Sequence, residues 1–300
     1  MINGIINVYK EKGYTSFDVV ALMRGIAGQR KVGHTGTLDP MAEGVLPVCL
    51  GSATKLCDML NDKSKEYVAV FVLGKRTDTL DATGTVLEER KVCVTPEQLK
   101  EAVMSFKGGY NQLPPMFSAK WVNGQRLYDL ARKGREVERT PVFVEINDIE
   151  VIDVSLPYFT IRVSCGKGTY IRSLGEDIAA KCGEIAMMTE LTRTRVSNFE
   201  IGKAYTLSEL SKMRDEGSLA SVVLSTDEAM PFYRKVFVKS EFDRLLDNGN
   251  KLRTSEVTKD FYAENGEILR MYKSTGMFTG LYVFRENEGN FVPYKMFIGE

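Results

Sequence analysis

The segment Gly33–Pro40, Gly-His-Thr-Gly-Thr-Leu-Asp-Pro, restricts the conformation of this chain more than any other stretch. Its two glycines permit backbone angles that other residues avoid, which is typical of a tight, irregular loop. Pro40 disfavours the helical conformation at Asp39 and favours an extended backbone there. The segment continues through Met41–Gly44 into Val45–Val48, a mostly apolar run that predicts a strand. We therefore expect a loop that presents the Asp39 carboxylate just before a buried strand. A turn with a helix-capping aspartate and a carboxylate that performs chemistry both fit this pattern.

Composition narrows the class of protein. A length of 300 residues predicts one large and one smaller domain, and 43% hydrophobic with 27% charged residues is typical of a globular protein. No apolar run is long enough to cross a bilayer, and the N-terminus lacks the charged region of a signal peptide, so we expect a cytoplasmic protein without membrane contact. The five cysteines include no C-x-x-C pair, which predicts buried thiols in a reducing compartment. A single histidine argues against a His-ligated metal site, and we expect no metal.

The segment 105–140 is locally basic although the net charge of the whole chain is zero. Its charged residues are seven basic and three acidic ones: Lys107, Lys120, Arg126, Arg132, Lys133, Arg135 and Arg139 against Asp129, Glu136 and Glu138. Five aromatic residues are interleaved with them: Phe106, Tyr110, Phe117, Trp121 and Tyr128. Basic side chains with aromatics suit phosphate contact and base stacking. The alternative is a solvated loop whose long side chains cover apolar stems.

Strands and helices are predicted in mixed order along the first 230 residues. The expected strands are Ile2–Val8, Val45–Leu50, Lys65–Gly74, Val142–Asp153, Tyr158–Cys165 and Glu184–Arg195. The expected helices are one capped by Ser16, one over Ala53–Leu60, one opened by Thr95-Pro96-Glu97 and one from Thr169. Because strands and helices do not alternate regularly, we predict an α+β fold rather than a doubly wound sheet.

The sequence pattern changes near Pro231, after which the predicted strands are short and separated by glycines. A helix is expected over Phe237–Leu246, and short strands over Ile268–Tyr272, Met277–Phe284 and Phe291–Phe297, separated by glycines. Regularly spaced short strands predict a small barrel. We therefore expect two domains, residues 1–230 and 231–300.

Four blocks of the chain, in order, resemble the TruB family of tRNA pseudouridine synthases. They are Gly33–Pro40, Lys65-Glu66-Tyr67, Gly168-Thr169-Tyr170-Ile171-Arg172 and Leu191, within a similarity that covers roughly Gly4–Gly202. The lysine–proline–x–glycine opening of the family is present as Lys10–Gly13 without its proline. The resemblance implies a catalytic domain with a mixed central sheet, followed by a small PUA-like β-barrel domain that binds RNA.

The resemblance also assigns roles to residues. It implies that Asp39 is the catalytic nucleophile, that Arg172 pairs with it and that Tyr67 stacks on the target uracil with its hydroxyl near the reacting ring. His34 and Tyr170 would contact the substrate RNA, and Leu191 would form an apolar wall of the base pocket. Asp81 also matches a family position, without an assigned role. From the residues alone, Tyr67 and Leu191 would be core residues, and Arg172 a solvated charge on a helix.

The implied activity is the isomerisation of uridine 55 in the T-loop of tRNA to pseudouridine, by base flipping and a catalytic aspartate. Nothing is oxidised and no group is imported, so no cofactor is expected. The partner would be tRNA, held at its T-arm by the segment 105–140 and at its acceptor end by the C-terminal domain, and the protein would be a monomer. Two alternatives stay open: a guide-RNA-dependent relative, and a tRNA-folding chaperone. The long basic segment favours the stand-alone enzyme over the first, and the intact Asp39, Tyr67 and Arg172 argue against the second as the sole role.

Overall fold

A mixed sheet forms the centre of the molecule. The computed structural model describes residues 1–61, 63–118, 120–122, 124–258 and 262–298, and of Arg126 the backbone only. The strands of the sheet lie in the order β1 (Gly4–Lys10), β3 (Glu43–Leu50), β13 (Ala186–Val196), β4 (Lys65–Leu73), β12 (Tyr158–Cys165) and β11 (Ile146–Ser155). Strands β2 (Val32–His34) and β14 (Phe199–Glu200) pair with β3 and β13. The β3–β13 pair is parallel and the other pairs are antiparallel, so the predicted α+β fold with a mixed sheet is confirmed.

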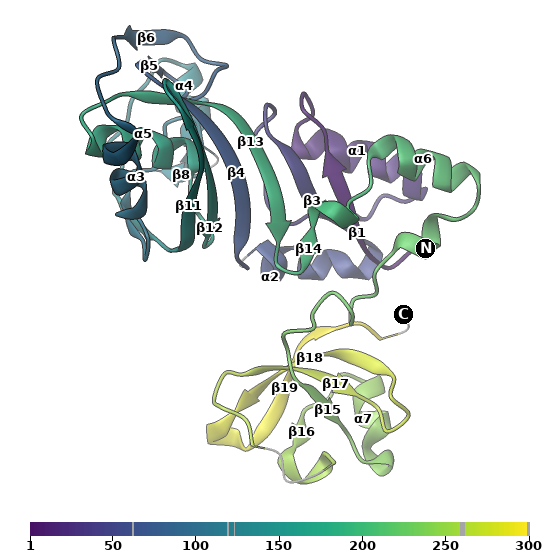
Figure 1. The fold of residues 1–300 in the computed structure, drawn as a ribbon. Coiled ribbons are helices and arrows are strands. Elements are labelled where there is room, and N and C mark those ends of the chain that lie inside the picture. The colour runs from purple at the N-terminus through teal and green to yellow at the C-terminus, as the bar shows by residue number, and fades with distance from the viewer. Residues whose placement is uncertain (62, 119, 123, 259–261, 299–300) are drawn as a thin grey trace.

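Helices cover both halves of this sheet. In Figure 1, α3 (Pro96–Met104) and α5 (Ile171–Lys181) lie by β4, β11 and β12, whereas α1 (Ser16–Ala27) and α6 (Leu207–Asp215) lie at the β1 end. Side chains of α3 and α5 share a core with the alternate buried residues of β4, β11, β12 and β13. A second core joins α1 and α6 to β1 and β3. The loop between β2 and β3 contacts both groups, because Leu38 belongs to the first core and its amide donates to the Ser16 hydroxyl of α1.

Helix α5 lies unusually close to the sheet. A Cβ atom built on Gly175 would come within 1.9 Å of the Phe71 ring, far below any real contact. The absence of a side chain at Gly175 therefore lets α5 rest directly on β4.

Several predicted boundaries were wrong, each for a local reason. Thr15, not Ser16, caps α1: its hydroxyl accepts from the Asp18 amide, and Ser16 is the first helical residue. The expected helix over Ala53–Leu60 divides into the 3-10 helix η1 (Gly51–Leu56) and α2 (Cys57–Asn61). The helix expected from Thr169 begins at Ile171 with Tyr170 as its N-cap. The strand expected over Val142–Asp153 divides at Glu145 into β10 (Val142–Val144) and β11. The remaining boundaries shift by one or two residues, and the helix opened by Thr95-Pro96-Glu97 begins at Pro96, as predicted.

The basic segment is a small unit attached to the sheet by β10. Its elements are β7 (Tyr110–Gln112), β8 (Trp121–Val122), β9 (Gln125–Arg126) and α4 (Leu127–Arg132), and β7 pairs with β10. Met116, Leu127 and Leu130 form a separate core inside it. A further hairpin, β5 (Lys75–Thr77) with β6 (Val86–Glu89), extends from the same end of the molecule in Figure 1.

The C-terminal residues form a curled sheet with its own core. Its strand order is β15 (Lys235–Phe237), β17 (Ile268–Tyr272), β18 (Phe278–Arg285), β19 (Asn290–Met296) and β16 (Leu252–Arg253). The helix predicted over Phe237–Leu246 was wrong, because the chain forms β15, a 3-10 helix and only then the short α7 (Asp243–Asp247). This 3-10 helix is η4 (Ser240–Phe242). Besides η1 and η4, the structure describes the 3-10 helices η2 (Ile201–Lys203), η3 (Leu219–Val222), η5 (Thr254–Glu256) and η6 (Glu286–Glu288).

The curled sheet contacts the rest of the chain beside α2 (Figure 1). Leu281 and Phe297 belong to one apolar cluster with Leu56 and Met230, and the Lys55 ammonium donates to the Met296 carbonyl at 2.6 Å. Among the described residues no helix is both long and apolar enough to cross a membrane. Of the cysteines, Cys49 and Cys165 are buried as expected, whereas Cys93 is exposed.

Candidate active site

The loop that carries Asp39 is fixed from two sides. The Leu38 amide donates to the Ser16 hydroxyl at 2.9 Å, and the Pro40 carbonyl accepts from the Gly13 amide at 2.8 Å. Gly36 has a φ of 105°, and a Cβ there would come within 2.5 Å of the Asn61 side chain. Glycine at position 36 is therefore required by both conformation and space. The loop leaves Asp39 with 34% of its side-chain surface exposed.

Arg172, at the start of α5, binds both carboxylate oxygens of Asp39. Its Nε lies 3.0 Å from Oδ2 and its Nη2 lies 3.2 Å from Oδ1. Such two-point contact is the strongest form of an arginine–carboxylate pair. The same guanidinium donates to the carbonyls of Thr79 and Phe117, both at 3.0 Å. Arg172 thus joins the Asp39 loop, the turn after β5 and the basic segment.

Asp81 is a second carboxylate on the same guanidinium. Its Oδ2 lies 3.6 Å from Arg172 Nη1, and only 4% of the residue is exposed. Its Oδ1 accepts from the Thr79 hydroxyl at 2.8 Å and from the Thr83 amide at 3.0 Å. The site therefore contains one partly open carboxylate and one enclosed carboxylate that share one cation.

Burial and the neighbouring cations act in opposite directions on the pKa of Asp39. Burial raises the pKa of its carboxyl, Arg172 opposes that shift and the neighbouring Asp81 adds to it, so that the pKa lies above its usual value. Lys10 is a further cation close by, fully buried, whose ammonium donates to the Tyr14 carbonyl at 2.6 Å. Burial lowers the pKa of Lys10 to about 8, although the nearby Asp39 acts in the opposite direction. A carboxylate with a raised pKa beside cations is typical of functional sites.

Tyr67 and Leu191 form the apolar side of the site. They lie on the neighbouring strands β4 and β13, are 7% and 5% exposed, and belong to one apolar cluster with Leu38 of the Asp39 loop. Burial raises the pKa of the Tyr67 hydroxyl, so this group is uncharged near neutral pH. Tyr67 lies directly opposite Arg193 in the β4–β13 pair, and the charge of the Arg193 guanidinium acts on the Tyr67 hydroxyl.

His34 lies on β2, at the start of the same loop. Burial and the nearby Arg193 charge lower the pKa of its imidazole, so the ring is neutral near pH 7. The exposed ring of Phe17 meets it edge to face, with 5.6 Å between ring centroids. A neutral imidazole beside an exposed aromatic ring suits contact with a base rather than with a phosphate.

Tyr170 is half-buried and immediately precedes α5. Its backbone amide donates to the Gln112 side chain at 2.8 Å, and its carbonyl accepts from the same side chain at 3.0 Å. Gln112 belongs to β7 and is buried, so the base of the basic segment holds the start of α5.

The structure thus brings Asp39, Arg172, Tyr67 and Leu191 together, with His34 and Tyr170 at the ends of adjoining elements. Sequence reasoning missed the contributions of Lys10, Asp81, Gln112 and Arg193. Asp81 and Lys10 had a signal, because both match family positions, whereas Gln112 and Arg193 resemble ordinary surface residues in a sequence. Within the described part of the chain, no cluster of three or more His, Cys, Asp or Glu side chains could bind a metal.

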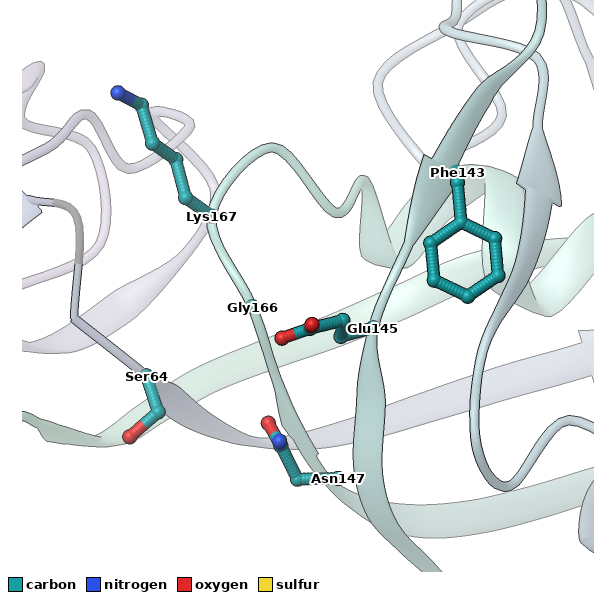
Figure 2. Close-up of a pocket in the computed structure, with 6 residues that line it drawn as sticks. All are labelled: Ser64, Phe143, Glu145, Asn147, Gly166 and Lys167. Atoms are coloured by element: carbon teal, nitrogen blue, oxygen red, sulfur yellow. The ribbon is translucent and has the colours of Figure 1, made fainter.

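A hollow of about 380 Å³ lies elsewhere, at the turn between β12 and α5. Figure 2 shows Glu145 directed toward Gly166, with Ser64 and Asn147 on nearby segments and Lys167 extending away. None of the predicted site residues lines it, and Glu145 is an exposed carboxylate. The chemistry therefore favours the cluster around Asp39 as the candidate active site.

The exposed face of the basic segment carries most of its charges. Arg132, Lys133 and Arg135 are exposed at the end of α4, and the Arg132 guanidinium lies over the Tyr128 ring at 5.5 Å. Trp121 is 60% exposed. The side chain of Arg126 and all of Ala119 lie outside the described residues.

Comparison with known proteins gives concordant results. Residues 24–171 match the TruB family pseudouridylate synthase N-terminal domain, and residues 172–231 match the tRNA pseudouridylate synthase B C-terminal domain. The second match begins at Arg172, inside α5, so it covers elements of the central sheet and ends where the curled sheet begins.

Full-length relatives and solved structures agree with this. The chain is 47% identical to tRNA pseudouridine synthase B of Lachnoclostridium phytofermentans, over 99% of this chain and 100% of the relative. It is 44% identical to tRNA pseudouridine synthase B of Clostridium tetani, over 91% and 92% of the two chains. A chain from a Cbf5–Nop10–Gar1 complex has a similar fold, with a TM-score of 0.76, 25% identity and coverage of 99% of this chain and 84% of that one. With its signature loop, its mixed sheet and these similarities, the chain belongs to the TruB family of pseudouridylate synthases.

Proposed function

We propose that this protein is a tRNA pseudouridine synthase that isomerises uridine 55 in the T-loop. The observation that carries the proposal is the Asp39 carboxylate, held at two points by Arg172 with a third of its surface open, beside the apolar side chains of Tyr67 and Leu191. The proposed activity agrees with the names of relatives that are similar over nearly the whole chain.

The reaction requires one carboxylate and an apolar surface that excludes water. Pseudouridine forms when the N1–C1′ bond of uridine breaks, the base turns and C5 joins C1′, after which the C5 proton leaves. Positive charge develops at C1′ during bond cleavage, and an adjacent carboxylate can stabilise it or attack covalently. Water must be excluded because hydrolysis would leave an abasic site, and the apolar Tyr67 and Leu191 suit that need. N1 takes up a proton in place of the one lost from C5, and all other atoms of the product come from the substrate, so the reaction consumes no cofactor.

Asp39 is the proposed nucleophile, and Arg172 the cation that orients it. Its two-point contact leaves the exposed part of the carboxylate as the place where a sugar can approach. Tyr67 would stack on the uracil with its hydroxyl near the reacting ring, while Leu191 closes the other side of the base.

The target base must leave its stack to reach Asp39, at a cost of roughly a few kcal/mol. We propose that His34 and Tyr170 contact the displaced RNA, and that the basic segment holds the T-arm through its exposed cations. The C-terminal sheet, residues 231–300, would bind the acceptor end as a PUA-like RNA-binding domain. A chain ending near Ala229 should then still convert an isolated T stem-loop but bind whole tRNA more weakly. Equal losses on both substrates would contradict this division into domains, and light scattering would test the proposed monomer.

The two alternatives predict different results. A guide-RNA-dependent enzyme needs a second RNA, whereas the proposed enzyme converts tRNA alone. A chaperone without turnover as its main role would leave the modification level of tRNA unchanged. The basic segment and the 47% identity to a tRNA enzyme, against 25% to the Cbf5 chain, support the stand-alone enzyme.

Release of tritium from C5 of labelled tRNA tests the proposal directly. The wild-type protein should release tritium from a transcript with uridine at position 55 and none from a transcript with cytidine there, in the absence of other RNA. Asp39→Asn should bind tRNA normally and release none. Asp148→Asn serves as the matched control, because Asp148 is exposed and pairs with Lys107 on the surface. Substantial turnover by Asp39→Asn would contradict the assignment, and tritium release at another uridine would contradict the site.

A further inference from the structure

Arg193 is a buried cation without an acidic partner. It lies on β13, is fully buried, and is in none of the ion pairs among the residues that the structure describes. Transfer of a charge from water to a protein interior is costly unless a partner compensates it. A buried guanidinium in this situation needs a physical reason, and its hydrogen bonds provide one.

The guanidinium of Arg193 donates to three backbone carbonyls. Its Nε donates to Val45 at 2.7 Å, Nη2 to Gly36 at 3.3 Å and Nη1 to Thr37 at 3.5 Å. Gly36 and Thr37 belong to the loop that presents Asp39, and Val45 to the strand that follows it. Arg193 also lies directly opposite Tyr67 in the β4–β13 pair, and its charge acts on the Tyr67 hydroxyl. One side chain thus connects the two elements that carry the proposed nucleophile and the proposed stacking tyrosine.

The backbone of Arg193 is fixed next to the same loop. Arg193 pairs with Gly44 where β3 and β13 run parallel. Gly44 has a φ of 106°, and a Cβ there would come within 2.3 Å of the Arg193 carbonyl oxygen. This close approach requires glycine, and it keeps the guanidinium within reach of Gly36 and Thr37.

We propose that Arg193 is a positioning residue that holds the Tyr67 hydroxyl and the Asp39 loop in one arrangement. It acts through these groups and does not itself contact the substrate. The proposal rests on the roles given above to Asp39 and Tyr67, and it adds the group that sets their separation. Displacement of reacting groups by about 1 Å can lower a rate roughly 100-fold.

Arg193→Lys is the decisive variant, because it keeps the charge but cannot make the forked contacts of a guanidinium. We expect kcat on tRNA to fall by about 100-fold with KM nearly unchanged. Arg193→Gln, which keeps one amide donor, should behave similarly. Arg195→Lys is the matched control: Arg195 lies on the same strand, bonds to Ser164 and Ser197, and should keep nearly full activity. Circular dichroism and tRNA binding establish that each variant is folded.

A double-mutant cycle with Tyr67→Phe separates positioning from general stability. If Arg193 acts through the Tyr67 hydroxyl, Arg193→Lys should cost much less in the Tyr67→Phe background than in wild type, in single-turnover rates with enzyme in excess. An equal cost in both backgrounds would overturn the proposal, and so would a loss of thermal stability with kcat unchanged. Failure of both Arg193 variants to fold would also overturn it, because Arg193 would then serve stability alone. Wild-type turnover in the same assay tests the proposed function separately, so the two failures remain distinct.

Discussion

Removal of Arg172 by Arg172→Met should destabilise the fold as well as the activity. The change leaves Asp39 and Asp81 without their shared cation and the carbonyls of Thr79 and Phe117 without a donor. Breaking a buried pair by removing one partner costs about 3–5 kcal/mol. Because Asp39 is 34% exposed and Asp81 keeps its bonds to Thr79 and Thr83, we expect the lower end, about 3 kcal/mol in the free energy of unfolding.

Urea unfolding at pH 8 measures this loss, with Arg76→Met as the control. Arg76, on β5, pairs with Glu176 of α5 at 3.0 Å, but the Arg76 side chain is 46% exposed. Its removal should therefore lower the free energy of unfolding by only about 0–1 kcal/mol. The pH dependence gives a second check. Without Arg172 the pKa of Asp39 rises further. An acid whose pKa is raised on folding destabilises the folded state fully above the raised pKa, less as the pH falls through it, and not at all well below the unfolded-state pKa of about 3.9. The deficit should therefore shrink as the pH falls toward 4.

A deficit below about 1 kcal/mol at pH 8 would refute the reasoning, because the guanidinium would then be no more than a surface charge. A deficit of the expected size that did not change with pH would place the loss in packing rather than in the two carboxylates.

Three further outcomes are expected. Asp39→Asn should raise the midpoint of thermal unfolding near pH 7, because the carboxyl has a raised pKa in the folded state. The gain should disappear below about pH 3, where a carboxyl with the ordinary pKa of about 3.9 is largely protonated in the unfolded chain too, and a lower midpoint at pH 7 would contradict the direction of the shift. Tyr67→Phe should keep RNA affinity and lose most of the rate in the tritium assay, whereas Tyr67→Ala should lose both, and equal, small effects would make Tyr67 a core residue. Substitution of Arg132, Lys133 and Arg135 by alanine should weaken tRNA binding. The slope of log affinity against log salt should fall by about 0.7–0.9 for each phosphate that the variant no longer neutralises. An unchanged slope would show that these three side chains face away from the RNA.

Local patterns predicted the elements whose causes are local. Tyr158–Cys165 and Ile268–Tyr272 are strands with the predicted bounds, and Pro96 is the first residue of α3, as its position after Thr95 predicts. The error at Ser16 has a tertiary cause, since its hydroxyl accepts from the Leu38 amide of the Asp39 loop and Thr15 caps the helix instead. Likewise, a periodic pattern over Phe237–Leu246 could not reveal that its first residue, Phe237, pairs with Tyr272 of β17.

The residues of the candidate site could not be linked to one another from their spacing in the sequence. Asp39 and Arg172 are 133 residues apart in the chain, and only the family resemblance linked them before the structure showed their contact. Arg193 was missed because a cation in a single sequence reads as a surface group, and the opening motif gave Lys10 no chemical role. The Arg193 guanidinium is held by carbonyls of the distant Gly36, Thr37 and Val45, which no local pattern reports.

Helix α5 contacts the Phe71 ring at Gly175, where any side chain would clash. The position of Arg172 on this helix therefore depends on the absence of a methyl group at residue 175. Alanine favours helices over glycine by about 1 kcal/mol, so a survey of helix propensities would choose Gly175→Ala to stabilise α5. Here the added carbon would meet the Phe71 ring at 1.9 Å and push the helix away from the sheet. Arg172, one turn earlier, would move with the helix while Asp39 stayed on its loop. A routine thermostabilising substitution would thus act as a catalytic defect, and libraries that improve this enzyme for heat should leave position 175 untouched.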